Sequence, residues 1–485
     1  MCPRASRALI LLVGVTFTLA GCGGSSQSTT ATASTTNYTV GGTISGLTIG
    51  SVVLANGTST VTVSSGVTSW IFPDSFAPGS SYSVTVQTQP STELCGVTSG
   101  ASGMNTGDVG NVTVVCGFGQ WRWQAGLNSV NASGVFGTQG TGAASNVPGA
   151  RYAGSTWTDA SGNFWLFGGV GYDSTGVAGD LNDLWRYSPS TGQWTWISGG
   201  SAHNVAGVYG TQGTGAASNV PGARYSASSW IDSSGKLWLF GGVGYDLTGG
   251  VGNLNDLWRY SPSTAQWTWI SGGSADNAAG VYGTEDAAAA SNVPGARYAA
   301  SSWIDASGNF WLFGGYGDDL DGNLGYLNDL WQFSPSSKQW TWVGGEAASD
   351  ASADYGTLGT VAATNVPGAR QAASSWTDSS GNLWLFGGVG YDATGGVGNL
   401  NDLWQFSPST AQWTWVSGGF GDNVGGVYGT RGTASASSVP GGRDSTSSWI
   451  DSSGNLWLFG GYGYDVGGQL GYLNDLWQYN PGSGS

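Results

Sequence analysis

The sequence predicts an all-β protein, and three observations support this prediction. Glycine accounts for 87 of the 485 residues, aromatic residues make up 13% of the chain, and charged residues only 9%. Many glycines and aromatic residues with few charges are typical of short strands that are joined by tight turns. A stretch of 73 residues also recurs along the chain, and each copy alternates apolar runs with Gly- and Ser-rich turns. The aromatic content excludes disorder for most of the length.

The N-terminus predicts export. Arg4 and Arg7 precede an apolar run of 13 residues, which is too short to span a bilayer, so residues 1–21 are expected to be a secretory signal peptide. The ending Leu19-Ala20-Gly21-Cys22 resembles the lipobox of bacterial lipoproteins. That resemblance implies a lipid on Cys22, a flexible tether over residues 22–36, and an anchor at the outer membrane or cell surface. An ordinary signal peptide with a chance cysteine is the alternative.

Residues 37–117 predict a small β-sandwich of the immunoglobulin-like kind. The segment is rich in Val, Thr, Ser and Gly, and Asn56-Gly57 is a hairpin turn signal between two runs of β-branched residues. Cys95 and Cys116 remain once Cys2 leaves with the signal and Cys22 takes the lipid, so we expect them to form a disulfide. We interpret this domain as a spacer or an adhesion module.

The repeat organises residues 118–485. One arginine marks each unit, at intervals of 73 residues: Arg151, Arg224, Arg297, Arg370 and Arg443. In the first unit we expect four strands, at residues 151–158, 164–167, 183–187 and 193–197, with Gly168-Gly169 ending the second. The second strand is apolar on both faces, so neighbouring sheets must cover both faces, as in stacked blades.

The two ends of the repeat region are complementary in sequence. Each complete unit ends in Gln-Trp-Thr-Trp, which the fifth unit lacks, whereas Gln120-Trp121-Arg122-Trp123 precedes the first unit. We therefore expect the strand at residues 120–124 to complete the fifth blade and close a ring of five, which leaves no major sheet edge.

The repeated motifs resemble those of the kelch family. They are the double glycine after strand two, the Asn-Asp-Leu-Trp-x-Tyr-x-Pro pattern in strand three, and the tryptophan of strand four. The resemblance implies a kelch-repeat β-propeller, the fold type of the central domain of galactose oxidase. Kelch rings usually have six or seven blades of shorter units, whereas the repeat here predicts five blades of longer ones. Copper radical oxidases of this fold need two histidines and a cysteine-linked tyrosine. The chain has only His203 and no cysteine after Cys116, so such a copper site is excluded.

The end of the blades that carries the long connections is the predicted binding face. The linker at residues 199–223 and the loop at residues 170–182 share this end, whereas the other end has only short turns. The candidate ligand-binding residues on it are Tyr172, Asp173, Tyr245, Asp246, Tyr316, Tyr391, Asp392, Tyr464 and Asp465. The third unit departs from the Tyr-Asp pair and also carries Asp318, Asp319 and Asp321.

Three roles are open for these residues. Aromatic rings beside oxygen acceptors can bind a protein or a glycan, clustered carboxylates can hold Ca²⁺, and the same residues can simply pack and cap loops. If the tyrosines prove buried, the linker residues Tyr209, Tyr282 and Tyr428 become the next candidates. The repeated arginines either ring a mouth that attracts acidic groups or pair with an aspartate of a nearby turn.

The sequence favours a surface-tethered binding module for protein or glycan ligands, monomeric and without catalytic residue, metal or cofactor. The formal charge of −16 and the few, scattered Lys and Arg residues exclude a nucleic-acid partner, and only the lipid is expected to contact the membrane. One alternative is a polysaccharide-acting glycosidase or lyase that uses loop carboxylates, for which Asp444 is the one acid in the innermost strands. The other is a purely structural envelope or adhesion protein.

Overall fold

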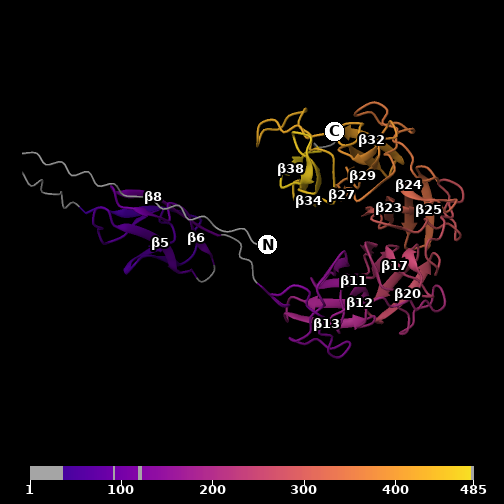
Figure 1. The fold of residues 1–485 in the computed structure, drawn as a ribbon, viewed down its shortest axis with the longest axis horizontal. Coiled ribbons are helices and arrows are strands. Elements are labelled where there is room, and N and C mark those ends of the chain that lie inside the picture. The colour runs from indigo at the N-terminus through magenta and orange to yellow at the C-terminus, as the bar shows by residue number, and fades with distance from the viewer. Residues whose placement is uncertain (1–36, 91–92, 118–122, 482–485) are drawn as a thin grey trace, which may run out of the picture. The chain divides into compact units, whose positions relative to one another are not determined.

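The computed structural model describes residues 37–90, 93–117 and 123–481, and this part of the chain contains strands and turns but no helix. Accordingly, no helix in the described ranges is long and apolar enough to cross a membrane. The chain divides into two compact units, residues 1–123 and 124–485, which are considered separately (Figure 1). The predicted signal peptide and tether lie outside the described residues.

The first unit is a β-sandwich. Its strands are β1 (Val40–Ser45), β2 (Ser51–Asn56), β3 (Ser59–Ser64), β4 (Ser69–Ile71), β5 (Ser81–Thr88), β6 (Cys95–Ser99), β7 (Ser102–Met104) and β8 (Val109–Cys116). They form two four-stranded sheets, in the orders β4-β1-β8-β6 and β3-β2-β5-β7. Both sheets contribute to one core, which contains Val40 and Val112 from the first and Leu54 from the second. The predicted hairpin at Asn56-Gly57 is confirmed, with Asn56 opposite Ser59.

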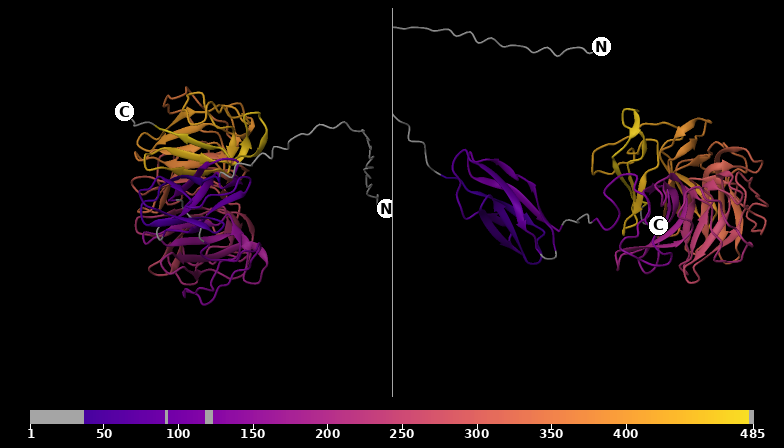
Figure 2. Two further views of the ribbon diagram at one scale, coloured as in Figure 1. Left: turned by 90° about the vertical axis from the view of Figure 1, so that its left-hand side faces the viewer. Right: turned by 60° about the horizontal axis from the view of Figure 1, so that its bottom comes forward.

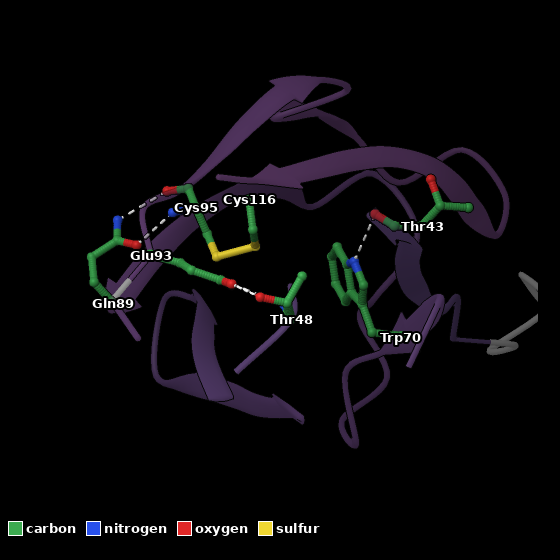
Figure 3. Close-up of a disulfide and its surroundings, with 7 residues drawn as sticks. All are labelled: Thr43, Thr48, Trp70, Gln89, Glu93, Cys95 and Cys116. Carbon is green, nitrogen blue, oxygen red and sulfur yellow. Dashed lines mark hydrogen bonds between the residues drawn. A yellow bond between two sulfur atoms is a disulfide. The ribbon is translucent and has the colours of Figure 1, made fainter. Parts of the chain in front are cut away.

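The predicted disulfide between Cys95 and Cys116 is confirmed (Figure 3). The two cysteines lie directly opposite each other on β6 and β8, and both are buried. Gln89 holds the start of β6, because its side chain donates to the Cys95 carbonyl and accepts from the Cys95 amide at 2.9 and 2.7 Å. The bridge therefore joins neighbouring strands of one sheet at the edge of the core.

In the described part of the second unit, each repeat of the sequence folds into one or two blade-like sheets; we call each repeat a blade and number the blades in chain order. The first blade contains β9 (Arg151–Tyr152), β10 (Ser155–Thr158), β11 (Phe164–Tyr172), β12 (Ala178–Ser188) and β13 (Gln193–Ser198). The second contains β14 (Arg224–Tyr225), β15 (Ser228–Ile231), β16 (Leu237–Phe240), β17 (Val243–Tyr245), β18 (Val251–Asn253), β19 (Leu257–Ser261) and β20 (Gln266–Ser271). The third contains β21 (Arg297–Tyr298), β22 (Ser301–Ile304), β23 (Phe310–Asp318), β24 (Leu324–Ser334) and β25 (Gln339–Gly344).

The last two blades follow the same plan. The fourth contains β26 (Arg370–Gln371), β27 (Ser374–Thr377), β28 (Leu383–Phe386), β29 (Val389–Tyr391), β30 (Val397–Asn399), β31 (Leu403–Ser407) and β32 (Gln412–Ser417). The fifth contains β33 (Arg443–Asp444), β34 (Ser447–Ile450), β35 (Leu456–Phe459), β36 (Tyr462–Tyr464), β37 (Leu470–Tyr472) and β38 (Leu476–Tyr479). Each of the first four blades contains an antiparallel four-stranded sheet, such as β10-β11-β12-β13, and the fifth has β34-β35-β38 among the described residues.

Apolar faces join each blade to the next. Trp165 and Phe167 of the first blade lie against Tyr260 and Trp267 of the second, with ring centroids 5.8 and 5.3 Å apart. The same contacts recur between later blades, as between Phe240 and Trp340. The sheets thus follow one another around an arc, from magenta to yellow in Figures 1 and 2, an arrangement that fits a β-propeller.

Two strand predictions need correction. The expected first strand is broken into β9 and β10, because Ala153 takes a positive φ of 54°. In the first blade the double glycine does not end the second strand, because β11 runs through Gly168-Gly169 to Tyr172 and pairs with β12 up to Ala178. The same holds for β23 in the third blade, whereas in the other three blades the strand ends before the double glycine, as β16 does at Phe240. The expected 14-residue loop is therefore a hairpin with a short turn at its tip.

The expected closing strand at residues 120–124 lies largely outside the described residues, so ring closure stays a prediction. The linkers between blades are better defined. In the linker at residues 199–223, Ala216 forms a bridge with Trp267 of the outer strand β20. Asn219 donates to the carbonyls of Thr214 and Trp267 at 3.0 and 3.3 Å. Each such linker is thus packed onto the outer edge of its blade.

Candidate binding surface

The repeated arginines are structural. Arg224 is 1% exposed and forms a bidentate ion pair with Asp256 at 2.6 and 2.7 Å. The same pair recurs in the other blades as Arg151–Asp183, Arg297–Asp329, Arg370–Asp402 and Arg443–Asp475. Of the two roles left open by the sequence, pairing is therefore the one observed. The partner, however, lies within the third strand of the same blade or directly before it, as Asp183 does within β12 and Asp256 before β19.

The linker tyrosines complete this network. Tyr209, which is 2% exposed, donates to Asp256 at 2.6 Å, and Trp258 Nε1 donates to the same carboxylate. Tyr282 and Tyr428 make the corresponding bonds to Asp329 and Asp475. Burial, together with the neighbouring carboxylate, raises the pKa of Tyr209 far above its ordinary value. Tyr209 and Tyr282 are thus buried inside their blades, whereas Tyr428 is half-buried, and all three hydroxyls are bound to a carboxylate.

The predicted ligand-binding aspartates cap hairpin turns. Asp173 is 2% exposed and accepts from the amides of Thr175 and Val177 at 2.7 and 3.0 Å. Asp246, Asp392 and Asp465 accept from equivalent turn amides, and Asp319 does so in the third blade. Burial opposes ionisation of Asp173, but hydrogen bonds from His203 and the turn outweigh it and lower its pKa. Their oxygens are thus committed to the backbone.

His203 also has a packing role. Its Nδ1 lies 2.8 Å from Asp173 Oδ2. In the third and fourth blades the carboxylate at the Asp173 position accepts instead from the backbone amides of Ser349 and Asp422. His203 therefore holds the tip of a hairpin. Within the described ranges, His, Cys, Asp and Glu side chains form no group of three that could hold a metal ion.

The predicted tyrosines are half-buried at the seams between blades. Tyr391 of the fourth blade lies 6.1 Å from Tyr326 of the third, measured between ring centroids. Tyr245 lies in the second blade, and the charge of Asp180 in the first adds to burial in raising its pKa. Tyr172 and Tyr464 are likewise half-buried. The structure thus places these four beside the surface described next, and only Tyr316 of the predicted set belongs to it.

At the end of the blades that carries these tyrosines, the residues at one level of cross-strand pairing differ among the repeats. We call this level the variable row. It consists of the residue directly after each repeated arginine, the residue directly after each double glycine, and the residue on the next strand that pairs with the latter. Its members are, blade by blade, Tyr152, Val170 and Asp180; Tyr225, Val243 and Asn253; Tyr298, Tyr316 and Tyr326; Gln371, Val389 and Asn399; and Asp444, Tyr462 and Tyr472.

The levels that flank the variable row are the same in all units. On one side Arg151 lies level with Gly171 and Gly179, and the same Arg-Gly-Gly level recurs in every blade. On the other side Gly169 pairs with Leu181, and these two residues also recur in each unit. Divergence is confined to one level between two that are unchanged, although the core residues recur from blade to blade. It indicates a surface that makes different contacts in each blade.

Aromatic residues concentrate in the third and fifth blades of the variable row. The ring centroids of Tyr298 and Tyr316 are 5.8 Å apart, and those of Tyr316 and Tyr326 are 5.2 Å apart. In the fifth blade Tyr462 and Tyr472 are 5.1 Å apart, and Tyr472 is 91% exposed. The sequence carried a signal for this group, since Tyr follows the arginine in three units, but only the register shows that these residues share a level.

The fourth blade and the acids give the variable row its polar groups. Gln371 Oε1 is buried and accepts no hydrogen bond from the described residues. Burial raises the pKa of Asp444 and that of Asp180 above their ordinary values. Asp444 also acts on Tyr326, two blades away, and helps to raise its pKa after burial and the nearer Tyr316.

A central cavity of about 460 Å³ lies at the other end of the inner strands. Ser, Thr, Ile and Trp side chains of β10, β15, β22 and β27 line it, among them Thr156, Ser229, Ser302 and Ser375. No charged side chain lines this cavity. It offers hydroxyl groups but no carboxylate pair of the kind that glycoside hydrolysis requires.

No family model and no curated protein sequence matches this chain. Among solved structures, the structure titled "Structure of YjhT" aligns with 69% of this chain and 82% of its own chain, at 15% sequence identity and a TM-score of 0.40.

Proposed function

We propose that this protein is an exported, surface-tethered module that binds a protein or glycan ligand through the variable row of a kelch-like, five-bladed propeller. In this proposal the sandwich is an immunoglobulin-like spacer, and the protein acts as a monomer without metal or cofactor. Binding residues are usually found on variable positions that a rigid scaffold presents. The carrying observation is that the repeats diverge at one largely half-buried cross-strand level while the levels on both sides stay the same.

The chemistry of the row supports recognition. Half-buried tyrosines carry much of the binding energy at many interfaces, because they bury a large ring at little cost in entropy. Neighbouring blades contribute to one another's environment here: after burial, Asp180 and Tyr152 of the first blade raise the pKa of Tyr225 in the second, and Tyr225 is among the groups that raise the pKa of Tyr298 in the third. A ligand that lies across the axis would therefore meet aromatic and amide groups from several blades at once.

Binding can be tested with the purified full-length chain against glycan arrays and by pull-down of surface proteins. The chain provides its own fold-compatible variant: Tyr316→Val and Tyr326→Asn give the third blade the residues of the fourth. We expect this double variant to unfold like the wild type and to lose at least tenfold in affinity for whichever ligand is found. Equal affinity of the two proteins would refute the assignment of the row.

Anchoring to the bacterial outer membrane through Cys22 is part of the proposal. It rests on the Leu-Ala-Gly-Cys ending and the Ser/Thr-rich stretch after it. Cys22→Ala should move the protein from the membrane fraction to the soluble fraction of fractionated cells. Membrane association that persists in this variant would contradict lipid attachment.

A second candidate function is action on a polysaccharide, and Asp444 is the observation that favours it. This carboxyl is half-buried, its pKa is raised by burial, and it lies on the same surface as Tyr326. A raised pKa suits a carboxyl that must donate a proton. Polysaccharide cleavage that disappears in Asp444→Asn would favour the enzyme, whereas binding that persists without cleavage favours the binding module.

A further inference from the structure

We infer that the ligand is a polysaccharide without acidic groups, and that it lies across the third, fourth and fifth blades with one aromatic contact at each end. This inference rests on the binding function proposed for the variable row. Three properties of that row support it: two equivalent aromatic pairs, a polar blade between them, and the absence of a free cation.

The aromatic pairs are equivalent positions in the repeat. Tyr316 and Tyr326 of the third blade occupy the levels that Tyr462 and Tyr472 occupy in the fifth. A sugar ring packs its C–H face on an aromatic ring and leaves its hydroxyls at the edge for hydrogen bonds. Two aromatic pairs at equivalent positions, separated by one blade, suit a ligand that offers the same group twice, as a polymer of one sugar does.

The fourth blade between the aromatic pairs presents amides in place of rings. Gln371, Val389 and Asn399 fill its part of the row, and the buried Gln371 Oε1 receives no hydrogen bond from the described protein atoms. A buried carbonyl oxygen without a donor is costly. The Gln371 side chain as a whole is half-buried, so its rotation would bring this oxygen to a ligand hydroxyl. Asn399 Nδ2 donates to the Tyr462 carbonyl at 3.1 Å and so orients this amide toward the fifth blade.

The charged residues in and next to the variable row disfavour a ligand that carries acidic groups. The repeated arginine that directly precedes the row in each blade is already bound to its own aspartate, as Arg370 is to Asp402 and Arg443 to Asp475. No member of the row is Lys or Arg, whereas Asp444 and Asp180 belong to it. A uronic acid or sulfated glycan would lose water from its anionic groups here without gaining a cation.

The test uses oligosaccharides of two to eight units in two matched series, neutral hexoses and uronic acids, with the full-length chain in isothermal titration calorimetry. We expect affinity for the neutral series to rise with length until both aromatic pairs are covered, and no binding of the uronic acids. The paired variant Tyr462→Val with Tyr472→Asn gives the fifth blade the residues of the fourth. It should weaken binding of the longest neutral oligosaccharide at least tenfold and change binding of the shortest less than twofold.

We expect this paired variant to fold, because Val389 and Asn399 already occupy the same positions in the fourth blade. Ser233→Ala, in a short turn at the opposite end, is the matched variant and should bind as the wild type does. Binding of the uronic acid series, or equal loss for short and long oligosaccharides, would overturn the inference. If a protein ligand requires the row and no glycan binds, the binding function stands and the glycan inference is wrong. If no ligand depends on the row, both are wrong.

Discussion

At the scale of single residues, one aspartate organises each blade. Asp256 is fully buried and accepts four hydrogen bonds, two from Arg224 and one each from Tyr209 and Trp258. A buried carboxylate with this many donors costs little because each of its oxygens is satisfied. The aspartate thereby connects the inner strand, the third strand and the linker of one blade, and the same group recurs in the next blade around Asp329.

Removing the charge of this aspartate should be strongly destabilising. Asp256→Asn keeps the shape of the side chain but leaves the Arg224 guanidinium buried without a counter-charge. We expect a loss of about 3–5 kcal/mol in the free energy of unfolding, measured by denaturant titration. The exposed turn substitution Ser233→Ala should change it by less than about 0.5 kcal/mol. A loss below about 1 kcal/mol in Asp256→Asn would contradict the role of the pair.

The pair in the fifth blade should make stability depend on pH. Burial alone would raise the pKa of Asp475, but hydrogen bonds from Arg443, Trp477 and Tyr428 outweigh it and lower the pKa to about 2. The unfolded value is about 3.9, so this stabilisation is fully present above that pH and is lost as the pH falls toward 2. Melting temperatures of wild type and Asp475→Asn should differ at pH 6 and converge toward pH 2. A constant difference would argue against the linkage.

At the scale of elements, the double glycine shapes every blade. Gly168 has a φ of 64°, and a Cβ there would lie 2.6 Å from the Arg224 carbonyl oxygen of the next blade and 2.9 Å from that of Leu181. In the second blade, Gly242 donates to the Arg297 carbonyl at 2.9 Å, which joins that blade to the third. The glycines thus permit close backbone contact between blades, which explains why strand pairing is irregular or interrupted there.

Two glycine substitutions should distinguish the energetic cost of steric crowding from the cost of a strained backbone conformation. Gly162 has a φ of 76° with no heavy atom within 4 Å of a built Cβ, so Gly162→Ala should cost only about 1 kcal/mol. Gly168→Ala adds the clash with two carbonyl oxygens and should cost about 2–4 kcal/mol. Urea unfolding of both variants measures the difference, and equal losses would show that the close approach has no energetic role.

At the scale of the whole molecule, the fifth blade differs from the others where its fourth strand is expected. In the third blade Trp340 packs on Phe240, Trp331 and Phe333, with ring centroids 5.3, 6.4 and 5.0 Å apart. The equivalent residues Phe386, Trp477 and Tyr479 instead line a cavity of about 70 Å³. By sequence, Trp121 of the predicted closing strand corresponds to Trp340.

Ring closure therefore predicts a specific dependence on Trp121. Because Trp121 would fill this cavity, Trp121→Ala should lower the free energy of unfolding of the propeller by about 3–5 kcal/mol, as truncation of other buried tryptophans does. Calorimetry of the full chain should show the loss in the transition of the propeller, while the sandwich transition stays unchanged. A propeller transition identical to that of the wild type would contradict closure by this strand.

Much of the fold was predictable because it repeats. The 73-residue period, the apolar second strand and the tryptophan spacing determined the blade-like sheets, and export chemistry with the cysteine count determined the Cys95–Cys116 bridge. Local patterns of this kind need no knowledge of distant contacts, because alternation and turn residues act over a few positions. The correct strands of the sandwich followed from β-branched runs in the same way.

Only the tertiary structure decided what the polar and aromatic residues of each unit do. Arg224 and Asp256 are 32 residues apart in sequence, and nothing local reveals that they form a buried pair. Asp173 and Tyr172 looked alike as candidates, yet the turn uses the carboxylate as a cap and leaves the ring at a seam between blades. The variable row became visible only through register, because a cross-strand level joins residues that the chain separates, and pairing rather than sequence order decides which side chains share a surface.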